Sequence, residues 1–289
     1  MAIATMLSCS TGGNTQLTES GLNPAAFDTT INNKPVKLFT LKNKSGMEVC
    51  ITNFGGRVVS LTVPDKDGKP TDVVLGYDNI RQYADSVNSP SDYGSTVGRY
   101  ANRIDKGHLH VNGKDYQLPQ NNFGHCLHGG PSGWMYQVYD AEQPNDTTLV
   151  MRLMSPDGDN NFPGTVKTTA TYKVLSNNTL DITFEATTDK ETVVNMTSHG
   201  FFSLAGIANP TPTCEDVICE INADFYIPID ENSIPTGEIR SVKGTPFDFT
   251  TPHAVGDFID DLSNEQIKNG AGYDHCFVLG DFNNWKVSN

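Results

Sequence analysis

Apolar and polar residues alternate one by one over long stretches of this sequence, which restricts the chain to folds built from β-strands. Residues 166–174 and 180–186 place mostly apolar side chains at every second position, with lysine, threonine, aspartate or glutamate between them. Residues 149–153 continue the same pattern. Because successive side chains of a strand point to opposite faces, each run predicts an antiparallel strand with one buried and one solvated face.

The turn residues agree with this prediction. Asn112-Gly113 lies between two short alternating runs, and this dipeptide favours the tight primed turn of a hairpin. The chain also holds 26 glycines and 16 prolines, which is enough to separate many short strands. Helical spacing is restricted to residues 79–84 and 264–268, which predict single turns. We therefore expect one large all-β domain over residues 26–289, formed by two packed or strongly curved sheets.

The charge of the chain restricts its ligands. There are 20 lysines and arginines against 34 aspartates and glutamates, which gives a formal net charge of −14. Binding to a nucleic-acid backbone needs clustered cations, so an acidic surface of this size argues against it. A neutral or weakly polar small molecule fits this charge better. The sequence does not indicate an oligomeric state.

The first nine residues form a short, apolar, uncharged run that ends in Cys9. The run is too short to span a bilayer, and it resembles the end of a bacterial lipoprotein signal with Cys9 as the lipidated residue. Residues 1–25 would then be a signal remnant and a flexible tether, and the protein would be periplasmic or lipid-anchored. The alternative is a disordered start to a cytoplasmic protein.

The other cysteines do not decide between these compartments. Cys50, Cys126 and Cys276 lie in apolar contexts, where they are expected to be small core residues. Cys214 and Cys219 are close enough in sequence to pair across a loop, although nothing in the sequence requires a disulfide.

Residues 194–204 contain the best catalytic candidate, His199. If this segment is extended, the apolar Val194 and Met196 face one side, and His199 faces the other side with polar neighbours. A histidine titrates near neutral pH, so it can donate or accept a proton at little cost. The sequence therefore predicts that His199 takes part in acid–base chemistry.

Arginine and histidine pairs occur in two further segments. Arg99 and Arg103 are four residues apart, with Asn102 beside the second arginine. Their guanidinium groups could form bidentate hydrogen bonds with the oxygens of a ligand, although a surface turn with solvated arginines explains the same pattern. His125 and His128 have a spacing that could hold a metal, but no matching ligand cluster follows, so no metal is expected.

Two local features suggest how a small ligand is held. A pair of glycines follows His128, which indicates a loop whose backbone approaches another segment closely. Asp248 lies between Phe247 and Phe249 in a turn-rich segment. A sugar suits such a place, because its C–H face stacks on an aromatic ring while its hydroxyls donate to the carboxylate. A turn-capping aspartate is the alternative.

Eight short motifs follow one another at residues 53–56, 98–104, 127–130, 155–158, 195–204, 234–239, 244–249 and 272–277. In this order they resemble the aldose 1-epimerase (galactose mutarotase) family. Each motif is weak by itself, but eight in the family's order are specific, and they cover roughly residues 30–280. The resemblance implies a β-sandwich of the supersandwich type that interconverts the α and β anomers of free sugars such as galactose and glucose, without a cofactor.

The resemblance also implies roles for individual residues. Asn102 and Arg103 match the family's sugar-binding pair, and Asp248 matches its ligand-binding carboxylate. The family's general acid falls on His199, which the strand argument reached independently, and His128 is the supporting loop histidine. In this chemistry a base removes the proton of the C1 hydroxyl while the acid protonates the ring oxygen, and the opened chain then rotates and closes.

Two departures from the family pattern affect the site. Gly200 and Phe201 stand where the family usually has serine and tyrosine, which removes two hydroxyls near the pocket. The family's general base is a glutamate beyond residues 272–277, and residues 281–289 contain none, so the base stays unassigned. We therefore expect a domain truncated at its C-terminus, without its last strands and with an exposed sheet edge. The chain would be an active epimerase with another base, a catalytically impaired sugar-binding protein, or an incomplete fragment.

Overall fold

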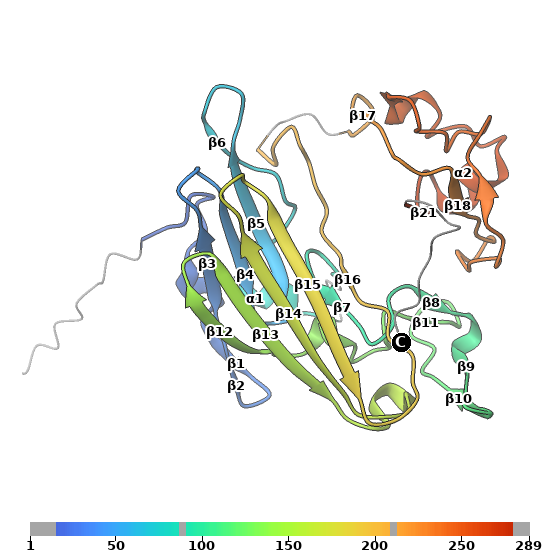
Figure 1. Cartoon of the computed structure of the whole chain (residues 1–289), viewed down its shortest axis with the longest axis horizontal. Coiled ribbons are helices and arrows are strands. Elements are labelled where there is room, and N and C mark those ends of the chain that lie inside the picture. The colour runs from blue at the N-terminus through green and yellow to red at the C-terminus, as the bar shows by residue number, and fades with distance from the viewer. Residues whose placement is uncertain (1–15, 87–90, 209–212, 280–289) are drawn as a thin grey trace, which may run out of the picture.

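Two four-stranded antiparallel sheets form the larger part of the protein (Figure 1). The computed structural model describes residues 16–86, 91–208 and 213–279. The first sheet has the strand order β3-β4-β5-β6, and the second has the order β12-β13-β14-β15. Several two-stranded pairs and a three-stranded sheet, β19-β18-β21, complete the described fold. The architecture is therefore all-β, as the alternation predicts.

Most elements are short, as the frequency of glycine and proline predicts. The strands of the two large sheets are β3 (Leu38–Lys42), β4 (Glu48–Thr52), β5 (Arg57–Pro64), β6 (Pro70–Asp72), β12 (Asp140–Asn145), β13 (Thr148–Ser155), β14 (Val166–Val174) and β15 (Leu180–Thr188). The other strands are β1 (Thr29–Ile31), β2 (Lys34–Val36), β7 (Thr96–Val97), β8 (Arg103–Ile104), β9 (His108–Val111), β10 (Lys114–Gln117), β11 (Cys126–Leu127), β16 (Thr197–Ser198), β17 (Ile218–Cys219), β18 (Phe225–Ile227), β19 (Arg240–Ser241), β20 (His253–Ala254) and β21 (Cys276–Val278). The helices are α1 (Ile80–Ala84), α2 (Glu265–Gly270) and the 3-10 turns Pro24–Phe27, Asp105–Gly107, Trp134–Tyr136, Asp159–Asn161 and Val255–Asp257.

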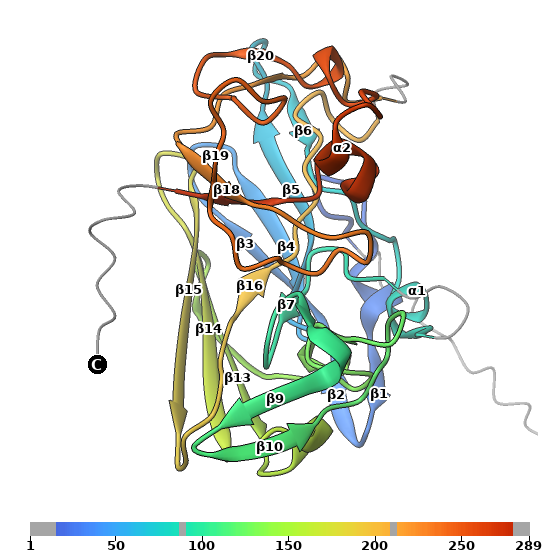
Figure 2. The same cartoon turned by 90° about the vertical axis from the view of Figure 1, so that its right-hand side faces the viewer.

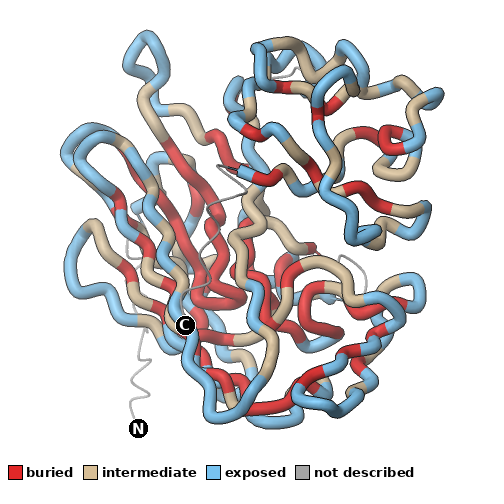
Figure 3. The backbone as a smooth tube through the Cα atoms, turned by 45° about the vertical axis from the view of Figure 1, so that its right-hand side comes forward, coloured by how far each residue is buried: buried red, intermediate tan, exposed pale blue. Residues whose placement is uncertain are grey.

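The main core lies between the two large sheets, where Figure 3 shows a band of buried chain. Along β13 and β14, every second residue is buried. Leu149, Met151 and Tyr172 are completely buried and belong to one cluster with residues of β4 and β5. Burying one such side chain stabilises a fold by about 1.5–3 kcal/mol, so this interface holds the two sheets together.

The predictions for the turn and for the two short helices are confirmed. Asn112 and Gly113 have φ values of +50° and +69°, and they connect β9 to β10 as a tight hairpin. Helices α1 and α2 occupy the two segments with helical spacing. Each begins after an asparagine, Asn79 or Asn264, whose side chain accepts a hydrogen bond from a backbone N–H of the first turn.

Residues 213–279 form a smaller lobe beside the large sheets (Figure 1). Its own core consists of Tyr226, Val242, Phe247 and Ile267. The rings of Tyr226 and Phe247 stack with their centroids 4.4 Å apart. The lobe therefore has apolar packing of its own in addition to its connection to the sheets.

Two of the three cysteines expected in the core, Cys50 and Cys126, are buried. The prediction for Cys276 is wrong, because it begins β21, which lies at the edge of the sheet β19-β18-β21 among the described residues, and it is exposed there. Cys214 and Cys219 are free thiols.

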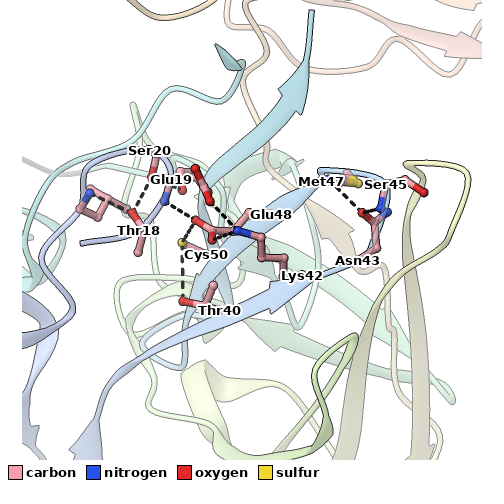
Figure 4. Close-up of polar contacts among 12 residues, drawn as sticks. Thr18, Glu19, Ser20, Thr40, Lys42, Asn43, Ser45, Met47, Glu48 and Cys50 are labelled. Carbon is pink, nitrogen blue, oxygen red and sulfur yellow. Dashed lines mark hydrogen bonds and ion pairs between the residues drawn. The ribbon is translucent and has the colours of Figure 1, made fainter. Parts of the chain in front are cut away.

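Glu19 and Ser20 are bonded to the first sheet, and Figure 4 shows polar contacts of this segment. The N–H of Glu19 donates to Oε1 of Glu48 over 2.7 Å, and the ammonium group of Lys42 contacts both carboxylates. Leu22 is buried in a cluster with Phe27. This part of the segment predicted as a tether is therefore held on the sheet.

The predicted lipidation site, Cys9, lies outside the described residues. Within residues 16–86, 91–208 and 213–279, no helix is long and apolar enough to cross a membrane.

Candidate active site

His199 directly follows β16, and β16 lies beside β7 (Figure 2). The N–H of His199 donates to the carbonyl of Ser95 over 2.8 Å, and the carbonyl of His199 accepts from the N–H of Gly94 over 2.8 Å. These two bonds hold the backbone of His199 against the turn that precedes β7. Its side chain is left half-buried.

The loop after β11 positions His128. The N–H of His128 donates to the carbonyl of Asn102 over 3.1 Å, which joins this loop to the segment before β8. Gly129 has a φ of +83°, and a Cβ there would lie 2.2 Å from the carbonyl oxygen of Gly98. The two backbones therefore approach as closely as the glycines after His128 predict, and only glycine fits at position 129.

A second backbone hydrogen bond fixes the ring of His128. The N–H of Asn102 donates to Nδ1 of His128 over 3.0 Å. Since Nδ1 is the acceptor, the proton of the neutral ring lies on Nε2. Burial lowers the pKa of His128 to about 4, although the Asp92 carboxylate acts in the opposite direction. His128 is therefore a neutral imidazole near pH 7, with an N–H that can donate to a ligand.

His128, His199 and Asp92 come together at one place, and we call them the site triad. The rings of His128 and His199 contact edge to face, with centroids 5.1 Å apart. Oδ2 of Asp92 lies 3.9 Å from Nε2 of His128. One nitrogen or oxygen atom from each of the three residues lies within 4.8 Å of the other two.

The site triad is compact enough for a metal ion, but the protonation of His128 does not suit one. A ligating imidazole nitrogen must be unprotonated, whereas Nε2 of His128 carries the ring proton. Only His199 and Asp92 would remain, fewer than the three protein ligands of a catalytic zinc site. His125 does not belong to this cluster, and its Nδ1 accepts from the N–H of Lys106 over 3.0 Å. The site triad therefore suits hydrogen bonds to an oxygen atom better than metal binding.

A cavity of about 530 Å³ adjoins the site triad. Asp92 and His128 line it, together with Asn121 and Asn122, whereas His199 is not among the lining residues. This volume lies in the usual range for small-molecule sites. The carboxylate of Asp92 and the Nε2–H of His128 can bind the hydroxyls of a ligand, whereas the amide of Asn121 is already bonded to the backbone of Leu127.

Asn102 and Arg103 line a second cavity of about 240 Å³, which also includes Asp274. Nε of Arg103 donates to Oδ1 of Asn122 over 3.2 Å, so its guanidinium group reaches a residue of the first cavity. Oδ1 of Asn102 accepts from the N–H of Arg103 over 2.7 Å. The structure thus brings Asn102, Arg103 and His128 to adjoining surfaces.

Arg99 has a structural role that neither of the two sequence interpretations anticipates. Its side chain is only 2% exposed. The guanidinium group donates to the carbonyls of Pro163 and Gly164 over 2.7 and 2.9 Å, and to Oγ of Ser155 over 2.7 Å. It is neither solvated nor open to a ligand, because it closes the loop between β13 and β14.

Asp248 belongs to the smaller lobe. Its Oδ1 accepts hydrogen bonds from the hydroxyl and the N–H of Thr250, over 2.5 and 3.4 Å, in the manner of a turn-capping aspartate. It lines neither the cavity beside Asp92 and His128 nor the cavity beside Asn102 and Arg103. A contact between Asp248 and a sugar therefore stays a prediction from the family resemblance.

One residue of the site, Asp92, was not predicted from the sequence. Asp92 has no motif around it, and it reaches His199 only because β7 pairs with β16. The ring of Phe201 lies 5.2 Å from the ring of His199, centroid to centroid, and 5.0 Å from the ring of Tyr93. An aromatic contact therefore supports His199 at the position where the family usually has a tyrosine.

A larger cavity, about 660 Å³, lies away from the site triad, between β5, β6 and β15. Its lining is mostly apolar, including Phe202 and Leu204, and it contains no histidine. Because no histidine lines this cavity, the site triad is the better candidate for acid–base chemistry.

An all-β sandwich that holds two histidines and a carboxylate beside a polar cavity has the features of an isomerase that works by acid–base chemistry. The chain belongs to the aldose 1-epimerase family, since the model of that family, described as Aldose 1-epimerase, matches residues 37–287.

Relatives and solved structures agree with this assignment. The chain is 34% identical over 247 residues to the aldose 1-epimerase of Escherichia coli (strain K12), and the match covers 85% of this chain and 69% of the relative. It is 36% identical to the galactose mutarotase of Mus musculus, over 84% of this chain and 67% of the relative. The crystal structure of galactose 1-epimerase from Lactobacillus acidophilus NCFM superposes with a TM-score of 0.76 at 31% identity, over 88% of this chain and 73% of that chain. The galactose mutarotase-like sandwich is therefore the fold of this protein.

Proposed function

We propose that this protein interconverts the α and β anomers of free aldoses, with galactose and glucose as the first candidates. The observation that carries the proposal is the edge-to-face contact of His199 with His128, which lines a polar cavity. Similarity to an aldose 1-epimerase and a galactose mutarotase supports both the reaction and the sugar. The net charge of −14 agrees with a neutral substrate.

His199 is the general acid of this proposal. It protonates the ring oxygen as the bond between C1 and that oxygen breaks, while a base takes the proton of the C1 hydroxyl. The Nε2–H of His128 is oriented by Asn102 and donates a hydrogen bond to the same end of the sugar. Rotation about the C1–C2 bond and closure from the other face then give the second anomer.

Asn102 and Arg103 orient the ring by hydrogen bonds to its remaining hydroxyls. Their placement at the second cavity supports this role. Positioning of this kind removes much of the entropic part of the barrier. Asp248 contributes a further contact to the sugar if the family pattern holds.

Polarimetry of freshly dissolved α-galactose tests the proposal. The wild-type protein is expected to accelerate the decay of optical rotation, and His199→Asn is expected to lower the rate by roughly 10²- to 10⁴-fold, the usual contribution of a general acid. His108→Asn is the control, because the side chain of His108 is 61% exposed on β9. A wild-type decay equal to that of the buffer, with galactose and with glucose, would contradict the proposal.

The alternative is a protein that binds a sugar without turning it over. Asn122 lines the cavity and accepts a hydrogen bond from Arg103, so these two residues can bind hydroxyls without any proton transfer. Calorimetric binding of galactose by a protein that leaves the rate of mutarotation unchanged would favour this alternative.

A further inference from the structure

We propose that the hairpin of β9 and β10 carries a binding site for Zn²⁺, with His108, His110 and Asp115 as its three protein ligands. We call these residues the hairpin cluster. None of them lines the cavities of about 530 and 240 Å³, so the site is separate from the place of the sugar chemistry.

The alternation of β9 places both histidines on the same face of the hairpin. His108 and His110 are exposed, whereas Leu109 and Val111 are buried. Asp115 lies directly opposite His110 in the register of the two strands. Because paired residues of antiparallel strands point to the same face, all three side chains of the hairpin cluster lie on its solvent side.

One oxygen of Asp115 already contacts both imidazoles. Its Oδ1 lies 2.7 Å from Nδ1 of His110 and 3.4 Å from Nε2 of His108. The hydrogen bond with His110 is also the main reason why the pKa of Asp115 is lowered, which keeps the carboxylate ionised. An ionised carboxylate and neutral imidazoles are the forms in which these side chains bind a metal.

These distances are close to those of a tetrahedral zinc site. With bonds of 2.0–2.1 Å, neighbouring ligand atoms around the ion are about 3.3 Å apart. The contact of Asp115 with His108 already has this length, and the contact with His110 has to lengthen by about half an ångström when Zn²⁺ replaces the shared proton.

The third distance requires a rotation of a side chain. By the triangle inequality, Nδ1 of His110 and Nε2 of His108 are at most 6.1 Å apart, the sum of their distances to Oδ1 of Asp115. One imidazole therefore has to turn toward the other. Both histidine side chains are 61% exposed, so their packing does not fix them in one rotamer.

The kinds of ligand select the ion. Two imidazole nitrogens and one carboxylate oxygen are the donor set of several zinc sites, in which water takes the open position. Mg²⁺ and Ca²⁺ prefer oxygen ligands, and the hairpin cluster offers only one carboxylate. The displaced contacts are exposed and contribute about 0–1 kcal/mol, so they do not compete strongly with metal binding.

A bound ion would cross-link the two strands of the hairpin. Among the described residues, β9 and β10 pair only with each other. A two-stranded sheet by itself is marginally stable in water. Zn²⁺ held between His110 on one strand and Asp115 on the other therefore stabilises the folded hairpin.

Calorimetric titration of the metal-free full chain with ZnCl₂ at pH 7.5 tests the inference. We expect His108→Asn, His110→Gln and Asp115→Asn each to lower the affinity at least about tenfold, since even the loss of a group that only supports a ligand costs about 10- to 100-fold. Saturating Zn²⁺ should raise the melting temperature of the wild type more than that of the variants. MgCl₂ should give no binding to the hairpin cluster.

The variants also separate this site from other places where zinc could bind. Each of them keeps the site triad and the free thiols of Cys214, Cys219 and Cys276. Asp140→Asn is the matched control, because it removes a carboxylate that is 76% exposed and pairs with a lysine instead of a histidine. It should keep the affinity of the wild type within about twofold.

Two results would overturn the inference. The first is an equal affinity for Zn²⁺ in the wild type and in the three variants, or no binding in the wild type. The second needs no variant: the imidazole nitrogens of His108 and His110 keep their NMR shifts when Zn²⁺ is added to the wild type. An affinity that Asp115→Asn leaves unchanged also contradicts the site, because the carboxylate would then not be a ligand.

Discussion

The backbone N–H of Asn102 donates to Nδ1 of His128 over 3.0 Å, and this bond gives the two histidines of the site different chemical properties. It places the proton of His128 on Nε2, while burial keeps the ring neutral with a pKa of about 4. His199 has no such bond to a backbone N–H among the described residues and packs against Phe201 instead. One imidazole is thus a fixed donor, and the other is the general acid that we propose.

The lowered pKa of His128 predicts a pH dependence of folding stability. The unfolded chain takes up the proton of this ring as the pH falls through 6.5, but the folded protein does so only near pH 4. Between these values the unfolded state binds more protons, so the contribution of His128 is complete above pH 6.5 and is lost as the pH falls toward 4. The difference corresponds to roughly 3 kcal/mol.

Urea denaturation of the wild type and of His128→Gln at pH 7.0 and pH 4.5 measures this effect. The free energy of unfolding of the wild type is expected to fall by roughly 2–3 kcal/mol more than that of His128→Gln. His110→Gln, at an exposed position of β9, serves as the control and should follow the wild type. Equal losses in the wild type and in His128→Gln would mean that His128 titrates normally.

Removal of metal ions is expected to leave the reaction unchanged, because Nε2 of His128 is protonated and cannot act as a ligand. The measurement is the rate of mutarotation before and after dialysis against EDTA, followed by addition of Zn²⁺. A rate that is lost in EDTA and recovered with Zn²⁺ would contradict the protonation state that we derive from Asn102.

The ring of Phe201 is expected to support the orientation of His199. An aromatic contact of this kind is worth about 0.5–1.5 kcal/mol, which corresponds to roughly a 2- to 12-fold loss of kcat in Phe201→Leu. Phe202→Leu is a matched control, since the neighbouring ring lines the apolar cavity away from the site triad. Equal rates for Phe201→Leu and Phe202→Leu would show that Phe201 does not support the orientation of His199.

The alternation of side chains was sufficient to predict the all-β fold, because burial on one face of a strand leaves a period of two in the sequence. It also placed β13, β14 and β15, and the Asn-Gly hairpin followed from the positive φ that this turn requires. His199 could be selected from its strand pattern as well as its family motif, and His128 from its family motif. The edge position of Cys276 could not be predicted, since an apolar context does not show which strand of a sheet is outermost.

Asp92 and Arg99 show what the sequence could not provide. Both depend on contacts between distant segments: Asp92 reaches His199 by the pairing of β7 with β16, and Arg99 bonds carbonyls more than 60 residues away. No local pattern marks a carboxylate that another strand brings to a histidine. For the same reason, the sequence around a buried arginine that bonds carbonyls does not differ from the sequence around a solvated arginine or a ligand-binding arginine.

The approach of Gly129 to Gly98 provides a test of how precisely the loop holds His128. Gly129 and Gly124 both have a φ of +83°, so an alanine at either position bears the same backbone strain, about 1–3 kcal/mol. They differ in space, since a Cβ at Gly129 would lie 2.2 Å from the carbonyl oxygen of Gly98, whereas a Cβ at Gly124 meets nothing within 4 Å. The difference in activity and stability between the two variants therefore measures the effect of the collision separately from that of the strain.

Gly129→Ala is expected to displace His128 from the N–H of Asn102, and a shift of about 1 Å in such a group lowers the rate by roughly 100-fold. Gly124→Ala should keep kcat/KM within about twofold of the wild type, while its melting temperature falls because of the shared strain. The measurements are mutarotation kinetics and thermal melts of both variants. If Gly129→Ala loses stability to the same extent as Gly124→Ala and keeps its activity, the loop can move away from Gly98 without moving the imidazole. The site would then depend on the hydrogen bond from Asn102 alone, and not on the close contact of the two backbones.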